Sequence, residues 1–314
     1  MPGHTRSKRR LGLVAGVGGA MLTALILATV AFGSTSSSNV AAQEAAAHKC
    51  VVMAGSGDPA FVRNFNPYVS TSTPAGAVVK GAIYEPLIVT TVAGGGHTYP
   101  WLAQSWKWSN GNSTLTLNIR KNVKWSDGKP LTALDVVYSL VAGKQSSAMD
   151  QIGLLKTGTN VASIRATGKY KVVIKLHSAD SAFIPVTLGG VFIVPQHIWS
   201  KVADPSTFTD STPVGSGPFD VVQAFSSQAY TLGKNPHYWV AGAPKVACLQ
   251  YVQAASNDSA LALIQSGQVD WTHNFVPNAA QAYDSKNPKY FHYFYPVNTF
   301  AQSLVFDDSQ YPYS

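Results

Sequence analysis

The chain has 314 residues and a formal net charge of +8, from 23 Lys and Arg against 15 Asp and Glu. Charged residues make up only 12% of it, against the ~25% typical of soluble domains. Four of the positive charges lie within the first ten residues, and no basic run longer than two residues follows them. This distribution argues against a nucleic-acid partner.

The N-terminus has the pattern of an export signal. A basic stretch at residues 6–10 precedes 22 residues without a charge. The pattern predicts a signal peptide over residues 1–33, cleaved before Ser34 or before Gln43. A run of this length also has the length of a retained membrane anchor. Cys50 does not follow a Leu-Ala-Gly-like box, so we expect no lipobox and a periplasmic or cell-surface protein.

The segment after the signal peptide and the two cysteines lead to two further expectations. Residues 34–47 are rich in Ser, Ala and Asn without apolar periodicity, which predicts a disordered tether. Cys50 and Cys248 each lie in an apolar stretch typical of a buried strand. Because an exported chain meets oxidising conditions, we expect a disulfide between them rather than two separate buried thiols.

Short strands are predicted between residues 106 and 176. The apolar positions that recur at every second residue are Leu115, Leu117 and Ile119, and then Val172, Ile174 and Leu176. With Asn-Gly and Gly-Lys turns between the segments, this pattern is typical of an antiparallel sheet with one solvent-facing side. Thr132 and Asp135 have the spacing of a capping box and predict the start of a helix.

The second half of the chain mixes helices and strands. Ser256 precedes a helical apolar pattern that ends at Gly267, and residues 246–252 and 268–271 on either side are predicted strands. A strand–helix–strand unit indicates an α/β layer. The fold class predicted for the whole chain is therefore mixed α/β.

No motif for catalysis is found. The sequence lacks a His-Glu-x-x-His helix, a phosphate-binding Gly-x-x-x-x-Gly-Lys loop and a Gly-x-Ser-x-Gly elbow, and its eight His have no metal-ligand spacing. Asp127 and Asp135 could be taken for the two carboxylates of a glycosidase. Asp127 is better explained by its position in a turn, and Asp135 by its position at a helix N-terminus. We therefore expect a protein that is not an enzyme and has no metal or cofactor.

A series of segments resembles the family 5 extracellular solute-binding proteins, the peptide- and nickel-binding group of ABC importers. The matching segments are 65–67 (Phe-Asn-Pro), 83–87, 102–106, 115–120, 123–136, 214–219, 235–239 and 266–270. Their order and spacing hold from about Lys49 to the last residue. A single match of this kind would be weak, but the ordered series is specific.

The resemblance implies a periplasmic-binding-protein-like clamshell of two lobes that close over a ligand. Lobe one would comprise residues 48–88 and 191–293, with residues 89–190 as an extra antiparallel β-rich subdomain. Residues 294–314 would begin lobe two. Because family members continue well beyond this point, we expect the chain to be C-terminally truncated, with the second lobe largely missing.

The ligand-binding wall of lobe one is expected at the carboxyl ends of its strands. The candidate residues are Asn66, Tyr68 and Thr73 after the first strand, and Trp271, His273, Asn274 and Phe275 after a later one. For Trp271 and Phe275, core packing is the alternative. Glu85 is expected to be a structural partner at a lobe boundary.

The function implied by the resemblance is the capture of short peptides by a monomer, for delivery to an ABC permease in the membrane. An oligosaccharide is the alternative ligand, and an aromatic platform such as Trp271 would suit it. An extracytoplasmic sensor or an enzyme reusing the fold is the alternative from a different class. Either would need a further domain after residue 314 or a Ser/His/acid cluster at the cleft.

Overall fold

The structure, a computed structural model, describes residues 50–55, 57–69, 75–90, 97–150, 153–154, 159–180, 183–274, 276, 278 and 281–282. The predicted signal peptide, the tether and the expected start of lobe two lie outside the described residues. Among the residues described, no helix is both long enough and apolar enough to cross a membrane.

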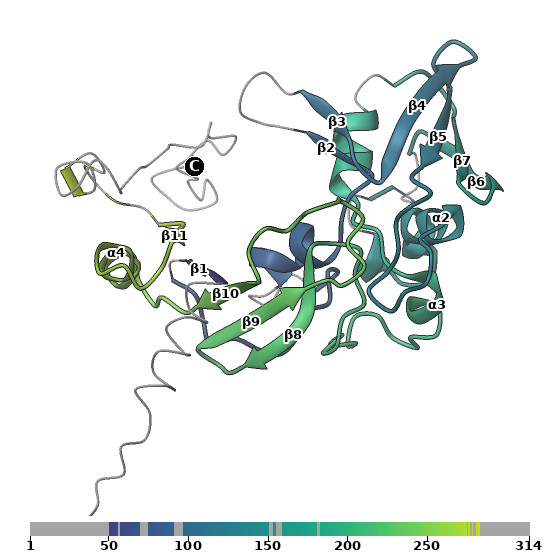
Figure 1. Cartoon of the computed structure of the whole chain (residues 1–314). Helices are drawn as coiled ribbons and strands as arrows, with labels where there is room; N and C mark the ends of the chain where they lie inside the picture. The colour runs from purple at the N-terminus through teal and green to yellow at the C-terminus, as the bar shows by residue number, and fades with distance from the viewer. Residues whose placement is uncertain are drawn as a thin grey trace, which may run out of the picture. The chain divides into compact units, whose positions relative to one another are not determined.

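The larger sheet has five strands in the order β11-β1-β10-β9-β8 (Figure 1). The strands are β1 (Cys50–Ala54), β8 (Phe219–Phe225), β9 (Ala229–Lys234), β10 (Cys248–Val252) and β11 (Trp271–Thr272). Strand β1 pairs in parallel with both β10 and β11, whereas β9 is antiparallel to β10 and to β8. The sheet therefore joins the first described strand to strands that follow it by about 200 residues.

Helix α4 (Asn257–Gln265) covers one side of this sheet. Ser256 and Ser259 form a reciprocal capping box at its N-terminus, and Gly267 follows its last turn at a φ of +74°. The side chains that pack between the helix and the strands are Ala260, Leu263 and Ile264 from α4, with Val52, Ala54, Val252, Ala254 and Val269. The predicted strand–helix–strand unit is present, but its second strand lies at Trp271–Thr272 rather than at residues 268–271, and β1 is inserted between its two strands.

The second sheet is antiparallel throughout, in the order β4-β5-β7-β6. Its strands are β4 (Ala103–Ser109), β5 (Thr114–Ile119), β6 (Val161–Gly168) and β7 (Lys171–Leu176). The Asn-Gly-Asn turn between β4 and β5 has positive φ at all three residues, a conformation that Asn and Gly tolerate best. The predicted apolar positions of β5 and β7 are all buried, so the expectation of one buried and one wet face is confirmed.

Helix α2 (Ala133–Val141) packs against β6 and β7 and begins with the predicted capping box. The Thr132 amide donates to Asp135 Oδ2 at 2.8 Å, and Asp135 Oδ1 accepts from the Gln196 amide at the start of α3 (Gln196–Trp199) at 3.0 Å. Asp127 accepts from the Lys129 amide and lies 2.8 Å from His197 Nε2. Both carboxylates therefore fix local structure, as the sequence indicated.

The remaining elements are short. They are β2 (Ile88–Thr90), which pairs with β3 (Thr98–Pro100), and helical segments of 3-10 or π type at Ala75–Ile83, Ala142–Lys144, Ser147–Met149 and Phe183–Leu188. The Gly-Ser-Gly turn at residues 215–217 packs directly on the end of the first of these helical segments. A Cβ on Gly215 or Gly217 would overlap the carbonyl oxygens of Ile83 and Ala82, so the motif serves close backbone packing.

Glu85 connects segments that precede and follow the antiparallel sheet. Its buried carboxylate accepts hydrogen bonds from Trp101 Nε1 at 2.8 Å, Trp239 Nε1 at 3.1 Å and the Tyr238 hydroxyl at 3.3 Å. Arg120 lies over the Trp239 ring, 4.7 Å from its centroid. Burial raises the pKa of Glu85 to about 7, although the three donors oppose the shift. This geometry fits the structural role that we expected for Glu85.

Candidate ligand-binding edge of the five-stranded sheet

The carboxyl ends of three parallel strands meet at one edge of the larger sheet. Since β11, β1 and β10 are adjacent and parallel, the segments that leave them emerge side by side. The His273 amide donates to the Ala54 carbonyl at 3.1 Å, and the Asp58 amide donates to the Ala254 carbonyl at 3.2 Å. Residues from three distant parts of the sequence thus form one surface, which we call the binding edge.

Two stacked rings lie on the binding edge. The Trp271 and His273 ring centroids are 6.3 Å apart with an angle of 13° between the ring planes. Trp271 is 37% exposed, so the core-packing alternative does not hold for this residue. Asn274 follows, and its side-chain oxygen accepts from Thr272 Oγ1 at 3.4 Å. An exposed flat aromatic surface beside polar groups is typical of a site that binds a ligand without reacting with it.

Asp58 adds a carboxylate to the binding edge. A Cβ built on Gly55 would lie 2.5 Å from Asp58 Oδ2 and 2.6 Å from the Tyr251 hydroxyl, so glycine leaves room for both groups. Burial raises the pKa of Asp58, whereas the backbone of Gly55 and the nearby His273 lower it. Asp58 Oδ2 is buried and has no hydrogen-bond partner among the described residues. Oδ2 faces Gly55 and the Tyr251 hydroxyl, and the Asp58 residue as a whole is half-buried, so the edge carries a partly exposed carboxylate.

Asn66 and Tyr68 have internal partners. Asn66 is fully buried, and its Nδ2 donates to the Pro205 and Phe208 carbonyls at 2.7 and 2.6 Å. Its Oδ1 accepts from the Tyr68 amide at 2.8 Å, and the Tyr68 ring packs edge-on against Trp199. This geometry favours a structural role for Asn66, and ligand contact by Asn66 or Tyr68 stays a prediction. The other two predicted residues, Thr73 and Phe275, lie outside the described residues.

Sequence reasoning missed the carboxylate of the binding edge. Asp58 follows the sequence Gly-Ser-Gly at residues 55–57, directly after the first strand, and this sequence pattern was the available signal. Gln253 was also missed, and its Nε2 donates to the Asp58 carbonyl at 2.9 Å. Within the described part of the chain, no cluster of three or more His, Cys, Asp or Glu could hold a metal ion. The groups that the edge offers are an aromatic face, one carboxylate and several amides.

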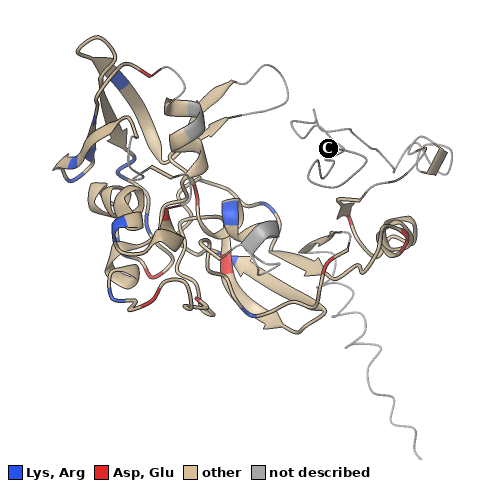
Figure 2. Cartoon of the chain, turned by 180° about the vertical axis from the view of Figure 1, so that it is seen from behind, with Lys and Arg blue, Asp and Glu red and all other residues tan. Residues whose placement is uncertain are grey.

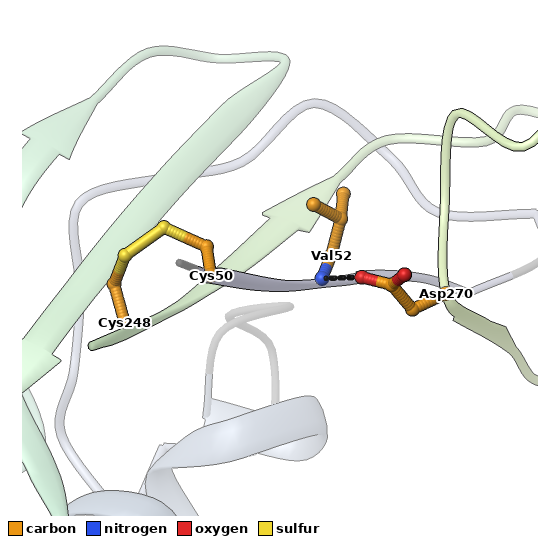
Figure 3. The surroundings of a disulfide bond; sticks show 4 residues. All are labelled: Cys50, Val52, Cys248 and Asp270. Atoms are coloured by element: carbon orange, nitrogen blue, oxygen red, sulfur yellow. Dashed lines mark hydrogen bonds between the residues drawn. A yellow bond between two sulfur atoms is a disulfide. The ribbon is translucent and has the colours of Figure 1, made fainter. Parts of the chain in front are cut away.

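A disulfide joins the strands that carry the binding edge (Figure 3). Cys50 and Cys248 are register partners on β1 and β10, bonded to each other with their Cα atoms 4.4 Å apart. Two residues further along, the Val52 amide donates to the carboxylate of Asp270 at 2.8 Å (Figure 3). These links hold β10, β1 and the start of β11 in a fixed register, so the edge at their other ends rests on a rigid base.

A mixed α/β fold with an exposed polar and aromatic edge fits a protein that binds a solute at this edge. The family model of the bacterial extracellular solute-binding proteins, family 5 middle region, matches residues 97–314. The chain therefore belongs to this family, a family of solute-binding proteins.

Curated relatives agree with the family match. The chain is 30% identical over 209 residues to the oligopeptide-binding protein AppA of Bacillus subtilis, covering 65% of this chain and 37% of the relative. It is 26% identical over 273 residues to the periplasmic oligopeptide-binding protein OppA of Salmonella typhimurium, covering 82% of this chain and 48% of the relative. The chain thus spans between a third and a half of the length of these relatives.

Solved structures confirm the periplasmic-binding-protein-like fold. A periplasmic oligopeptide-binding protein from Thermotoga maritima with bound mannohexaose superposes with a TM-score of 0.64 at 27% identity, over 73% of this chain and 42% of that one. AppA of Bacillus subtilis in complex with a nonapeptide superposes with a TM-score of 0.59 at 26% identity, over 77% and 46%.

Proposed function

We propose that this protein is the extracytoplasmic substrate-binding component of an ABC importer, which captures short peptides and presents them to a membrane permease. The observation that carries the proposal is the binding edge of a chain that belongs to a solute-binding family. Relatives named as oligopeptide-binding proteins and a structural neighbour with a bound nonapeptide favour a peptide as the ligand. The protein would act as a non-enzymatic monomer, exported by the predicted signal peptide.

In this proposal the binding edge forms one wall of the ligand site. The stacked Trp271 and His273 rings would contact side chains of a peptide, and Asn274 would contact its backbone. The half-buried carboxylate of Asp58 would attract a terminal ammonium or a backbone N–H group of the peptide. A peptide suits this surface because its backbone alternates donors and acceptors along an extended chain.

An oligosaccharide is the second candidate ligand. The observation that favours it is the exposed Trp271 ring, because a flat aromatic face packs well against the apolar face of a sugar ring. The neighbour from Thermotoga maritima carries mannohexaose although its name is that of an oligopeptide-binding protein. Within this family, the name of a relative therefore does not decide between the two ligands.

Titration calorimetry of the full chain with a mixed short-peptide library and with a mixed oligosaccharide set tests the proposal. We expect heat of binding with the peptides, and Trp271→Ala should weaken that binding about tenfold or more through loss of an aromatic contact. Tyr99→Ala is the matched control, because Tyr99 is also an exposed aromatic residue but lies on β3. Binding of oligosaccharides alone would favour the second candidate, and equal losses in both variants would remove the binding edge from the site.

A further inference from the structure

The solvent-facing side of the antiparallel sheet carries basic residues and no acidic ones. Strand alternation places Lys107 of β4, Arg165 of β6, and Lys171 and Lys175 of β7 on this face, because each pairs across the sheet with an outward-facing residue. Figure 2 shows basic residues along these strands. The four strands contain no Asp or Glu at all. The acidic residue nearest to them in sequence is Asp180, which lies beyond the end of β7.

Two further lysines extend this face at one end. Lys121 follows β5 and Lys169 lies in the turn between β6 and β7. A hollow of about 420 Å³ opens there, lined by these two lysines, Lys171, Gln104, Ser105, Asn118, Ile119 and Tyr170. The four cations on the strands and these two lysines are all exposed. Within the described residues, none of the six forms an ion pair with a carboxylate. We call this surface the basic face.

The side chains that lie between these cations are not those of a typical stable protein–protein interface. The side chains that share the outer face with them are mainly small and polar, such as Thr116 and Asn118, and Asn118 donates to Ser105 at 3.0 Å. Stable protein interfaces depend on buried aromatic or aliphatic anchors. The large exposed apolar residues among those described are Val62, Tyr99, Leu134, Val221 and Trp271. None of these belongs to the four strands.

The spread of the charges indicates an extended partner. Four strands span roughly 15 Å across the sheet at about 4.8 Å between neighbours, so a small anion in the hollow could reach only part of the basic face. Five of the six cations are lysines, whose flexible ammonium groups suit many loosely arranged phosphates better than one fixed bidentate contact. An anionic membrane surface presents phosphates in this way over a plane.

We propose that the basic face docks the protein on anionic phospholipid headgroups of the membrane beside which it works. The attraction is electrostatic and needs no insertion, since each Lys or Arg held near an anionic bilayer strengthens binding roughly fivefold. The face lies on a different sheet from the binding edge, so the proposal is independent of the ligand that the protein carries.

Sedimentation of the full chain with vesicles tests the proposal. One set contains phosphatidylcholine with about 30 mol% phosphatidylglycerol, and a second set contains phosphatidylcholine alone, which reports any contribution of the apolar N-terminal stretch. The neutralised variant combines Lys107→Gln, Arg165→Gln, Lys171→Gln and Lys175→Gln. The matched control combines Lys124→Gln, Lys201→Gln, Lys234→Gln and Lys245→Gln, four exposed lysines that lie outside the four-stranded antiparallel sheet. A third variant keeps the charge with Lys107→Arg, Lys171→Arg and Lys175→Arg.

We expect the neutralised variant to lose at least tenfold in partition to anionic vesicles, and the matched control to lose less than threefold. The charge-retaining variant should bind like the parent, and about 0.5 M salt should abolish the difference between the two vesicle types. Equal losses in both Gln variants would mean that only net charge matters and would overturn the proposal. The proposal would also be overturned if the parent protein showed no preference for anionic vesicles, or if it bound soluble polyphosphate but no vesicle. Should the neutralised variant unfold, Lys107→Gln and Lys171→Gln alone must each lower partition about twofold or more.

Discussion

Replacing Glu85 by Gln should change how the stability of the protein depends on pH. The Glu85 carboxyl is buried against two tryptophans and a tyrosine, and its pKa is raised from the ordinary value of 4.5 to about 7. An acid with a higher pKa in the folded state than in the unfolded state binds more protons when folded. Its contribution to stability is therefore fully present below pH 4.5 and is lost as the pH rises towards 7.

The magnitude follows from the size of the shift. A pKa difference of about 2.5 between the two states corresponds to about 3 kcal/mol over the whole window, of which about 2 kcal/mol falls between about pH 5 and pH 7.5. Burial also raises the pKa of Asp210 to about 7 and that of Asp220 to about 6. These two carboxyls act in the same direction, so we expect the parent protein to be more stable at mildly acidic pH than at neutral pH.

Urea unfolding of the parent protein and Glu85→Gln, followed by fluorescence across this pH range, provides the assay. The free energy of unfolding of the variant should fall about 2 kcal/mol less than that of the parent between the two ends of the range. Asp204→Asn is the matched control, because Asp204 is exposed and its pKa is lowered by hydrogen bonds from Ser206. Parallel curves for the parent and Glu85→Gln would refute the inference that this buried carboxyl titrates near neutral pH.

Two further predictions concern stability. Replacing both Cys50 and Cys248 by Ser should lower the free energy of unfolding by up to about 5 kcal/mol, because the disulfide closes a loop with a sequence separation of 198. The loss is measured from urea unfolding midpoints without reductant. An unchanged midpoint would contradict a disulfide that constrains the unfolded chain. Asn66→Ala should cost about 2–4 kcal/mol, because it leaves the Pro205 and Phe208 carbonyls without their donor, whereas Asn118→Ala on the exposed sheet face should cost far less. A thermal unfolding series separates these outcomes, and similar costs for both Asn variants would argue against the internal role of Asn66.

Local patterns were sufficient to predict much of the fold. The alternation at Leu115–Ile119, the capping box at Thr132 and Asp135, and the helix between Ser256 and Gly267 all depend on interactions within a few residues. Sheet order was not predictable from such patterns. The insertion of β1 between β10 and β11 joins residues about 200 positions apart, and only packing in three dimensions determines it.

The residues of the candidate site also fall into those that sequence patterns could predict and those that they could not. The exposed position of His273 follows from its location just after a parallel strand, which is a topological rule. Trp271 is instead the first residue of β11, where it pairs with Met53. The choice of Asn66 relied on a sequence motif, and a motif residue can serve structure as well as binding. Its partners, the Pro205 and Phe208 carbonyls, lie about 140 residues away, so no local pattern could reveal that the amide is occupied. The Gly-Ser-Gly sequence before Asp58 is too short to identify a site by itself, and the place of Asp58 at the edge depends on the approach of Tyr251.

The pairing of β1 with β10 affects how the chain reaches its native state. During synthesis, which starts at the N-terminus, β1 has no partner strand until almost 200 more residues have been added. The larger sheet therefore has high contact order, and its assembly is expected to be slow. Within these 314 residues, Cys248 is the one cysteine with which the Cys50 thiol can pair. The competing reaction is a bond to another molecule, so the yield of oxidative refolding should decrease as protein concentration rises.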